Sequence, residues 1–277
     1  MIKKLLVALL WMISSSATAA HFGSESVLVV EDGTGKILFE KNATPVMSIA
    51  SLTKLMTAMV VLDANLNMHE LITIDRSDVD ILKHSMSRVP VGAKITRGDL
   101  LQLALMSSDN RAAVALARTF PGGHSGFVAA ARAKAAMLGM SNTSIVEASG
   151  LSPGNVSTAY DLVKMAQAAS RYPDITRMTT DKTSVIHMSS RAVNFKNTNR
   201  LIGTQGWDIR LSKTGYTEEA GRCFIMRIAV GSKLATLVLL NAHASSVRIQ
   251  DASNIRRAMG GEPIQTVKKK RKSKRRK

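Results

Sequence analysis

The segment 51–62 reads SLTKLMTAMVVL and contains one charged residue, Lys54. Apolar side chains recur along it at helical spacing, at Leu52, Leu55, Met56, Met59 and Leu62. A helix that is apolar on nearly all sides is buried in the core of a protein. The segment therefore predicts a buried central helix that begins near Ser51 and carries a lysine in its interior.

Ser51 and Lys54 are three residues apart, so a helix brings both side chains to one face. A serine hydroxyl is a weak nucleophile until a neighbouring base takes its proton, and a free lysine is mostly protonated at neutral pH. Burial and a second nearby ammonium group, that of Lys213, would both lower the pKa of Lys54. We therefore expect Ser51 to be a nucleophile in the first turn of a helix, with a neutral or proton-shuttling Lys54 as its base.

Two further short motifs follow in the chain. Ser108-Asp109-Asn110 lies between two helical stretches, 97–105 and 111–117, in a run of residues with strong turn and cap preference. Lys213-Thr214-Gly215 ends a stretch with strand character. Each motif alone is weak evidence, because tetrapeptides such as Ser-x-x-Lys arise about once by chance in a chain of this size. Their order, and the local structure around each, make the set informative.

The side chains of these two motifs suit the chemistry of a peptide substrate. Ser108 is predicted to relay a proton to the leaving amine, and the amide of Asn110 both donates and accepts hydrogen bonds. Lys213 and Thr214 offer a cation and a hydroxyl to a substrate carboxylate, and Gly215 would let the substrate backbone lie close to the strand. Whether Lys54 acts alone or with Ser108 in the first proton transfer stays open at this point.

The remaining pattern predicts a sheet built from both ends of the chain. Two β-rich runs, 27–30 and 36–39, flank a Gly-rich turn and predict a hairpin. Helical periodicity dominates the central region, about 64–170, including the stretches 128–138 and 160–170. Strand character returns at 184–188 and Val193 and dominates in 210–213, 224–230 and 234–240. Strands at both ends with helices between them indicate a sheet with an inserted helical region.

The three ordered motifs, together with Gly150-Leu151-Ser152-Pro153 and Asn197-Thr198-Asn199, resemble the low-molecular-mass penicillin-binding proteins, which are serine D-alanyl-D-alanine peptidases. The resemblance implies an α/β fold: a three-layer sandwich of a mainly antiparallel sheet with helices on both faces, plus a helical region, with the active site between sheet and helical region. It also implies an oxyanion hole formed by the backbone N–H groups of Ser51 and Tyr216.

The resemblance is strongest to the D-alanyl-D-alanine endopeptidase branch, because of the short length and Tyr216 after the third motif. It implies hydrolysis of D-alanyl-diaminopimelate cross-links in peptidoglycan through an acyl-enzyme, and inhibition by β-lactams. Stem peptides and cross-links are the expected partners, and no cofactor is expected. The motifs alone do not separate this activity from a D-alanyl-D-alanine carboxypeptidase that trims stem peptides.

The two ends of the chain differ from the expected peptidase domain, 20–262. Residues 1–19 have two lysines, an apolar run too short to span a bilayer and a small-residue cleavage site, which predicts a cleaved export signal and a periplasmic protein. Nine basic residues in 268–277 account for half of the net charge of +18. We expect the tail, 263–277, to be disordered and to contact anionic membrane or wall, or to be a solvated charge run without function.

Other functions fit the sequence less well. A β-lactamase would share the motifs, but Glu147-Ala148-Ser149-Gly150 does not match the Glu-x-x-Leu-Asn pattern expected around its deacylating glutamate. A nucleic-acid arm is disfavoured by the export signal and by the scarcity of interleaved aromatic residues in the tail. His69-Glu70-Leu71-Ile72-Thr73 has threonine where a zinc protease has its second histidine, so no metal site is expected. Cys223 is the single cysteine and is expected to be a buried structural thiol.

Overall fold

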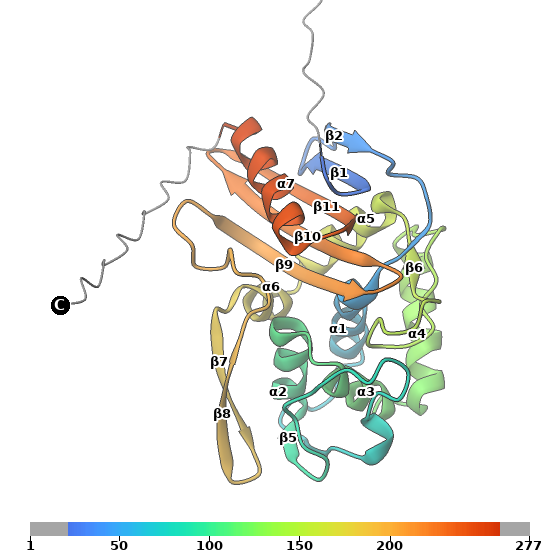
Figure 1. Ribbon diagram of the computed structural model, residues 1–277. Coiled ribbons are helices and arrows are strands. Elements are labelled where there is room, and N and C mark those ends of the chain that lie inside the picture. Colours follow the sequence, from blue (N-terminus) through green and yellow to red (C-terminus); the bar gives the residue numbers. More distant parts are fainter. Residues whose placement is uncertain (1–21, 261–277) are drawn as a thin grey trace, which may run out of the picture.

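The computed structural model describes residues 22–260 and centres on one antiparallel five-stranded sheet with the strand order β2-β1-β11-β10-β9 (Figure 1). The first two strands come from the N-terminal hairpin and the other three from the C-terminal part of the chain. The predicted assembly of the sheet from both ends is therefore confirmed. The strands are β1 (Ser26–Glu31), β2 (Ile37–Lys41), β9 (Asp208–Thr217), β10 (Gly221–Val230) and β11 (Lys233–Ala242).

Alternating side chains of the strands enter two separate apolar clusters, one on each face of the sheet. In β1, Leu28 and Val30 belong to the larger cluster, which the sheet shares with α5 (Ala159–Ala169) and the helical region. Val27 and Val29 belong to a smaller cluster under α7 (Ser245–Ala258). The fold is thus a three-layer sandwich, as predicted, although the helical pattern of α7 was not recognised in the sequence.

The helical region lies against the sheet on the side opposite to α7 (Figure 1). The predicted central helix is α1 (Thr53–Asp63), whose first nine residues are all buried. Around it are α2 (Arg97–Gln102), α3 (Asn110–Arg118), α4 (Gly123–Met137) and α6 (Pro173–Thr180). Short strand pairs complete the region: β3 (Met47–Ser48) with β6 (Val156–Ser157), and β4 (Leu71–Thr73) with β5 (Lys94–Thr96).

The strands predicted at 184–188 and around Val193 form a separate hairpin rather than part of the main sheet. β7 (Thr183–Met188) pairs with β8 (Arg191–Lys196), and the ribbon projects along the helical region at the lower left of Figure 1. The chain returns from this hairpin to the sheet through Asn197-Thr198-Asn199. Within residues 22–260, no helix combines the length and apolar character needed to cross a bilayer.

Candidate active site

Ser51 lies in a tight 3-10 turn, Ala50–Leu52, that directly precedes α1. Ser51 thus lies in the first helical turn, as predicted, and this turn is 3-10 rather than α-helical. The turn forms because Ala50 adopts a positive φ of 46° and a loop packs closely against it. A Cβ added to Gly150 would lie 1.9 Å from the carbonyl oxygen of Ala50, so only glycine fits there.

Lys54 is fully buried, and its Nζ atom has three oxygen neighbours. It donates to Ser51 Oγ at 2.8 Å, to Asn110 Oδ1 at 2.6 Å and to the carbonyl oxygen of Ser149 at 2.6 Å. Burial lowers the pKa of Lys54 from 10.5 to about 8, while the carboxylates of Glu147 and Asp109 oppose the shift. With a pKa of about 8 the amine is mostly protonated at neutral pH, and its minor neutral fraction is the form that could act as the base.

Glu147 holds the loop that presents the Ser149 carbonyl to Lys54. Its carboxylate accepts hydrogen bonds from the backbone N–H groups of Ser149 and Gly150, both at 2.6 Å, and from Asn155 Nδ2 at 2.9 Å. Asn155 Nδ2 also donates to the carbonyl oxygen of Glu147 at 2.9 Å. These bonds fix the loop, and no motif in the sequence predicts this role for Glu147.

The helix α2 continues into one turn of π-helix, Leu103–Ser107. The second motif begins directly after this turn at Ser108, which has a φ of 60°. Asp109 is the N-cap of α3, since its Oδ1 accepts from the N–H of Ala112 at 2.9 Å, so it does not face the substrate side. Asn110 follows with its amide between two partners. Oδ1 accepts from Lys54, and Nδ2 donates to Ser85 Oγ at 2.8 Å.

The third motif lies on β9, the edge strand of the sheet. Lys213 is buried, and its Nζ atom donates to Ser108 Oγ at 2.8 Å and to the carbonyl oxygen of Thr214 at 2.9 Å. Burial, together with the positive charges of Lys54 and Arg248, lowers the pKa of Lys213 well below its usual value. The sequence predicted that Lys213 lowers the pKa of Lys54, whereas the structure shows the converse effect, in which the charge of Lys54 lowers the pKa of Lys213.

The structure shows a second reason for glycine at position 215, beside the predicted approach of the substrate backbone. A Cβ at this position would lie 3.1 Å from both Ala50 Cβ and the carbonyl oxygen of Ile49, and 3.2 Å from the backbone nitrogen of Ser51. The glycine therefore lets β9 approach the turn that carries Ser51, in addition to any approach of substrate. Tyr216 follows with half of its surface exposed, and the guanidinium of Arg222 stacks on its ring at 3.6 Å from the centroid.

Two residues near the third motif, Thr198 and Arg248, were not predicted as site residues. Thr198 Oγ1 lies 2.7 Å from Thr214 Oγ1, and the Thr198 N–H donates to the carbonyl oxygen of Met106 at 3.1 Å. Arg248 of α7 donates to the carbonyl oxygens of Gly215 at 3.2 Å and Cys223 at 2.8 Å. Thr198, Thr214 and Arg248 line a pocket of about 470 Å³. The sequence could not place Thr198 and Arg248 at the site, because their contacts join separate segments of the chain.

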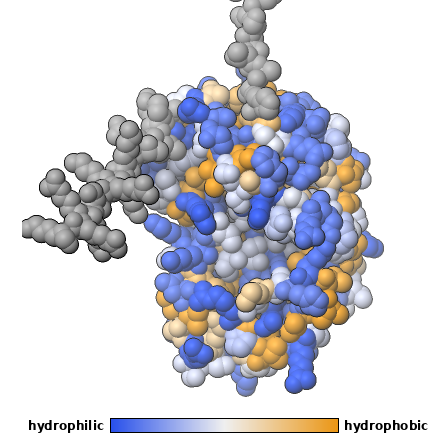
Figure 2. Space-filling model, in the orientation of Figure 1, coloured by the Kyte–Doolittle hydropathy of each residue, from blue (hydrophilic) through white to orange (hydrophobic). Residues whose placement is uncertain are grey.

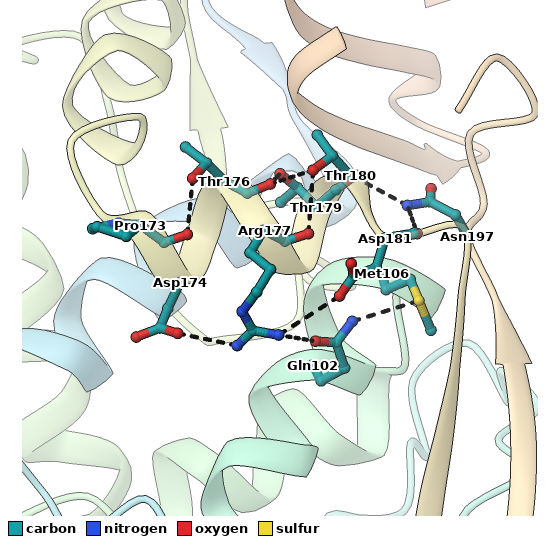
Figure 3. A network of polar contacts seen from close by, with 10 residues as sticks. All are labelled: Gln102, Met106, Pro173, Asp174, Thr176, Arg177, Thr179, Thr180, Asp181 and Asn197. Atoms are coloured by element: carbon teal, nitrogen blue, oxygen red, sulfur yellow. Dashed lines mark hydrogen bonds and ion pairs between the residues drawn. The ribbon is translucent and has the colours of Figure 1, made fainter. Parts of the chain in front are cut away.

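Asn197 and Asn199, which belong to the segment that resembles the family, hold the returning loop in place. Figure 3 shows Asn197 against the end of α6, where its Nδ2 donates to the carbonyl oxygens of Thr179 at 3.0 Å and Asp181 at 2.9 Å. Asn199 Nδ2 donates to Ser212 Oγ at 2.9 Å. In the same network Arg177 lies between Gln102 of α2 and two carboxylates, so α6 is joined to the helix that leads to Ser108.

The structure therefore brings all three motifs together around two buried amines. One amine contacts the Ser51 hydroxyl and the other contacts the Ser108 hydroxyl, and Asn110 bonds to Lys54. A hydroxyl next to an amine of lowered pKa is an arrangement for nucleophilic attack. Cys223 is buried, and burial raises the pKa of its thiol to about 11, which fits the structural role predicted for it.

Comparisons with known proteins agree with this arrangement. The chain is 45% identical to a D-alanyl-D-alanine endopeptidase of Pseudomonas aeruginosa over 86% of its length and 77% of that protein, and 42% identical to one of Escherichia coli over 88% and 79%. Penicillin-binding protein D2 of Listeria monocytogenes, solved in the ampicillin-bound form, superimposes with a TM-score of 0.74 at 31% identity, covering 87% of this chain and 98% of that one. The D-alanyl-D-alanine carboxypeptidase family matches residues 13–244. This chain therefore belongs to the D-alanyl-D-alanine carboxypeptidase family of serine peptidases.

Proposed function

We propose that this protein is a D-alanyl-D-alanine endopeptidase that hydrolyses peptidoglycan cross-links through an acyl-enzyme on Ser51. The observation that carries the proposal is the contact of 2.8 Å between Lys54 Nζ and Ser51 Oγ, in a site where burial brings the pKa of the amine to about 8. A neutral amine at that distance accepts the serine proton as the oxygen attacks a carbonyl carbon.

In the acylation step, Ser51 Oγ bonds to the carbonyl carbon of a D-alanine residue and its proton passes to Lys54 Nζ. The backbone N–H groups of Ser51 and Tyr216 are assigned to the developing oxyanion, and donors of this kind are commonly worth about 10²–10³ in rate each. The close approach of Gly215, the residue before Tyr216, to the backbone nitrogen of Ser51 supports this assignment. Asn110 Oδ1 stabilises the ammonium that Lys54 becomes.

Departure of the leaving amine requires a proton at its nitrogen. Ser108 Oγ is assigned to deliver it and to take in return the proton that Lys54 received from Ser51, so that Lys54 becomes neutral again; Ser108 Oγ also contacts the Lys213 amine. A carboxylate on the leaving residue would be bound by the Thr214 hydroxyl and the Arg248 guanidinium, which line the same pocket, and it would favour the protonated form of the neighbouring Lys213. Water then attacks the acyl carbon, and neutral Lys54 takes a proton from the water and passes it to Ser51 Oγ as the ester bond breaks.

The choice of endopeptidase over carboxypeptidase rests on two observations. The relatives in Pseudomonas aeruginosa and Escherichia coli are both endopeptidases. The pocket beyond Thr214 and Arg248, about 470 Å³, is much larger than one alanine requires, and Arg200 and Gln250 also line it. A carboxypeptidase releases a single D-alanine, whereas an endopeptidase must accommodate a leaving group that continues into a second stem peptide.

Digestion of purified cross-linked muropeptide dimers tests this choice. The expected result is conversion of dimers to monomers by the wild-type protein and none by Ser51→Ala. Pentapeptide monomers are the second substrate, because release of D-alanine from them without any cleavage of dimers would make the protein a carboxypeptidase instead.

Acylation by a fluorescent penicillin tests the nucleophile. A β-lactam carbonyl should trap Ser51 as an ester, in line with the ampicillin-bound relative. Uptake of label by the wild-type protein and loss of label in Ser51→Ala are expected, and a wild-type protein that takes up no label would contradict the mechanism. The hydrogen bonds of Glu147 to its own loop also argue against a β-lactamase, whose deacylating glutamate must hold a water.

We further propose that the protein is periplasmic and that the basic tail retains it at an anionic surface. Both proposals rest on sequence alone, because residues 1–19 and 263–277 lie outside the described residues. Each basic residue near an anionic membrane contributes about 1 kcal/mol, and salt screens the attraction. Truncation after Pro263 should abolish salt-sensitive retention on membranes or sacculi while leaving penicillin uptake intact. Unchanged retention would remove any such role from the tail.

A further inference from the structure

Residues 80–87, with the sequence DILKHSMS, form an exposed loop next to the second motif, which we call the strap. Its shape is set by one carboxylate. Asp80 Oδ1 accepts from the backbone N–H groups of Leu82 at 2.8 Å and Lys83 at 3.0 Å, and Oδ2 accepts from that of Ser85 at 2.8 Å. These three bonds fold the strap back on itself and fix the position of Ser85.

The strap does not owe its position to apolar packing. Its large apolar side chains face solvent, with Ile81, Leu82 and Met86 exposed by 79%, 64% and 99%. Apolar side chains gather accordingly on the lower right of the face in Figure 2, over the loop between β4 and β5. Since burial contributes little here, polar contacts must determine where the strap lies.

Two serines connect the strap to the Ser-Asp-Asn motif. Ser85 Oγ accepts from Asn110 Nδ2 at 2.8 Å, and Ser87 Oγ donates to Asp109 Oδ2 at 2.7 Å. The first bond matters for the reaction because Asn110 Oδ1 is, in turn, the acceptor for Lys54 Nζ at 2.6 Å. An amide has two opposite orientations. The Ser85 hydroxyl donates to the Asp80 carboxylate and lowers its pKa, so the Ser85 oxygen meets Asn110 as an acceptor and favours the orientation that directs Oδ1 to Lys54.

An ion pair connects the strap to the sheet. Lys83 Nζ contacts Glu219 Oε1, and Glu219 lies in the turn between β9 and β10, three residues after Tyr216. The contact raises the pKa of Lys83 and lowers that of Glu219. The strap thus reaches from the helical region to the strand that carries the third motif.

We propose that Ser85 is a positioning residue for the reaction: it orients Asn110 toward Lys54, and the Lys83–Glu219 ion pair holds the strap where Ser85 can do so. Ser85 touches no reacting atom and acts through Asn110. This inference rests on the proposed acylation of Ser51. According to this inference, the strap contributes to the rate of the reaction rather than to the stability of the fold. The bonds of Ser85 lead to the Asn110 amide, while the large apolar residues of the strap remain in solvent.

The test measures acylation of the full-length protein by a fluorescent penicillin and separates the maximal rate constant from the half-saturating concentration. Ser85→Ala should lower the maximal rate constant about tenfold, because misplacement of a catalytic group costs rate rather than affinity. The half-saturating concentration should change by less than about twofold. Ser85→Thr, which keeps the hydroxyl, should restore the rate to within about twofold of the wild type.

The ion pair gives a second variant series that removes no hydroxyl. Lys83→Met and Glu219→Gln should each lower the maximal rate constant about two- to fivefold, and the double variant should be no slower than either single one. The matched controls are Ser232→Ala, in the turn between β10 and β11, and Lys233→Met, at the first residue of β11, and both should acylate at the wild-type rate.

The inference is overturned if Ser85→Ala acylates at the wild-type rate, if its defect lies only in the half-saturating concentration, or if Ser85→Thr does not recover. Those outcomes leave the proposed function intact as long as the wild-type protein is labelled and Ser51→Ala is not. A wild-type protein that takes up no penicillin overturns the proposed function and this inference together. Melting temperatures of all variants identify any that fail to fold. If Ser85→Ala is one of these, the acylation rates of the Lys83 and Glu219 variants test the inference instead.

Discussion

The interior of the active site and its rim are built in opposite ways. In the interior, Lys54 and Lys213 are almost completely removed from solvent, and each contacts a serine hydroxyl. At the rim, Tyr216 is half exposed, and the strap of residues 80–87 is held by hydrogen bonds and one ion pair. The difference teaches that burial sets the chemistry of the amines, whereas directional polar contacts set the positions of the groups around them.

Removal of the buried base should have the largest effect. Lys54→Met keeps the length of the side chain and removes the amine, so acylation by penicillin should fall about 10²–10⁴-fold. The same variant should melt at a lower temperature, because Asn110 Oδ1 and the carbonyl oxygen of Ser149 lose their buried donor. Penicillin uptake and thermal unfolding, measured on one preparation, check the two expected effects. Undiminished acylation would mean that the buried amine of Lys54 does not set the chemistry of the site.

The close approach of β9 to the Ser51 turn is the next most sensitive feature. Gly215→Ala adds a Cβ that would lie 3.1 Å from the Ile49 carbonyl oxygen and 3.2 Å from Ser51 N, so the strand or the turn must shift by a few tenths of an ångström. We expect acylation to fall about 10²-fold, because small displacements of the reacting groups are costly. Stopped-flow measurement of the acylation rate tests this prediction. A rate within twofold of the wild type would show that β9 and the Ser51 turn can move apart without loss of activity.

Glu147→Gln tests the comparison between interior and rim, because Glu147 both holds the Ser149–Gly150 loop and raises the pKa of Lys54. The loss of a carboxylate acceptor for the Ser149–Gly150 loop should lower the free energy of unfolding by about 1–3 kcal/mol. The negative charge of Glu147 raises the pKa of Lys54, so its removal should shift the rise of acylation with pH to lower pH. Denaturant unfolding and a pH profile test the two parts, and a shift to higher pH would contradict the assignment.

The smallest effect should come from the exposed network around α6. Arg177 has more than half of its side chain exposed and pairs with Asp174 at 3.0 Å and Asp181 at 3.6 Å. Arg177→Met should therefore lower the free energy of unfolding by less than about 1 kcal/mol and leave acylation unchanged. A large loss of acylation, measured beside the melting temperature, would mean that this network positions Ser108 after all.

Much of this architecture could be predicted from the sequence, because it depends on local patterns of apolar and polar residues. The apolar run 51–62 predicted a central helix, the alternating strands at both ends predicted the sheet, and the three motifs predicted the family. The 3-10 turn at Ser51 was not predicted, because it results from the packing of Gly150 on Ala50, 100 residues apart in sequence. The contacts of Ser85 with Asn110 and of Thr198 with Thr214 likewise join distant segments through common polar residues, and no periodicity marks them.

The most direct test of the central claim is the pH dependence of the second-order rate constant for acylation of Ser51 by benzylpenicillin. Since a depressed pKa leaves Lys54 protonated only below its midpoint, the rate constant should rise with pH and reach half of its plateau near the Lys54 pKa of about 8. The Lys54→Met protein should show no such rise. A wild-type profile that is flat through this range, or that rises only near the pKa of an ordinary lysine, would contradict the account.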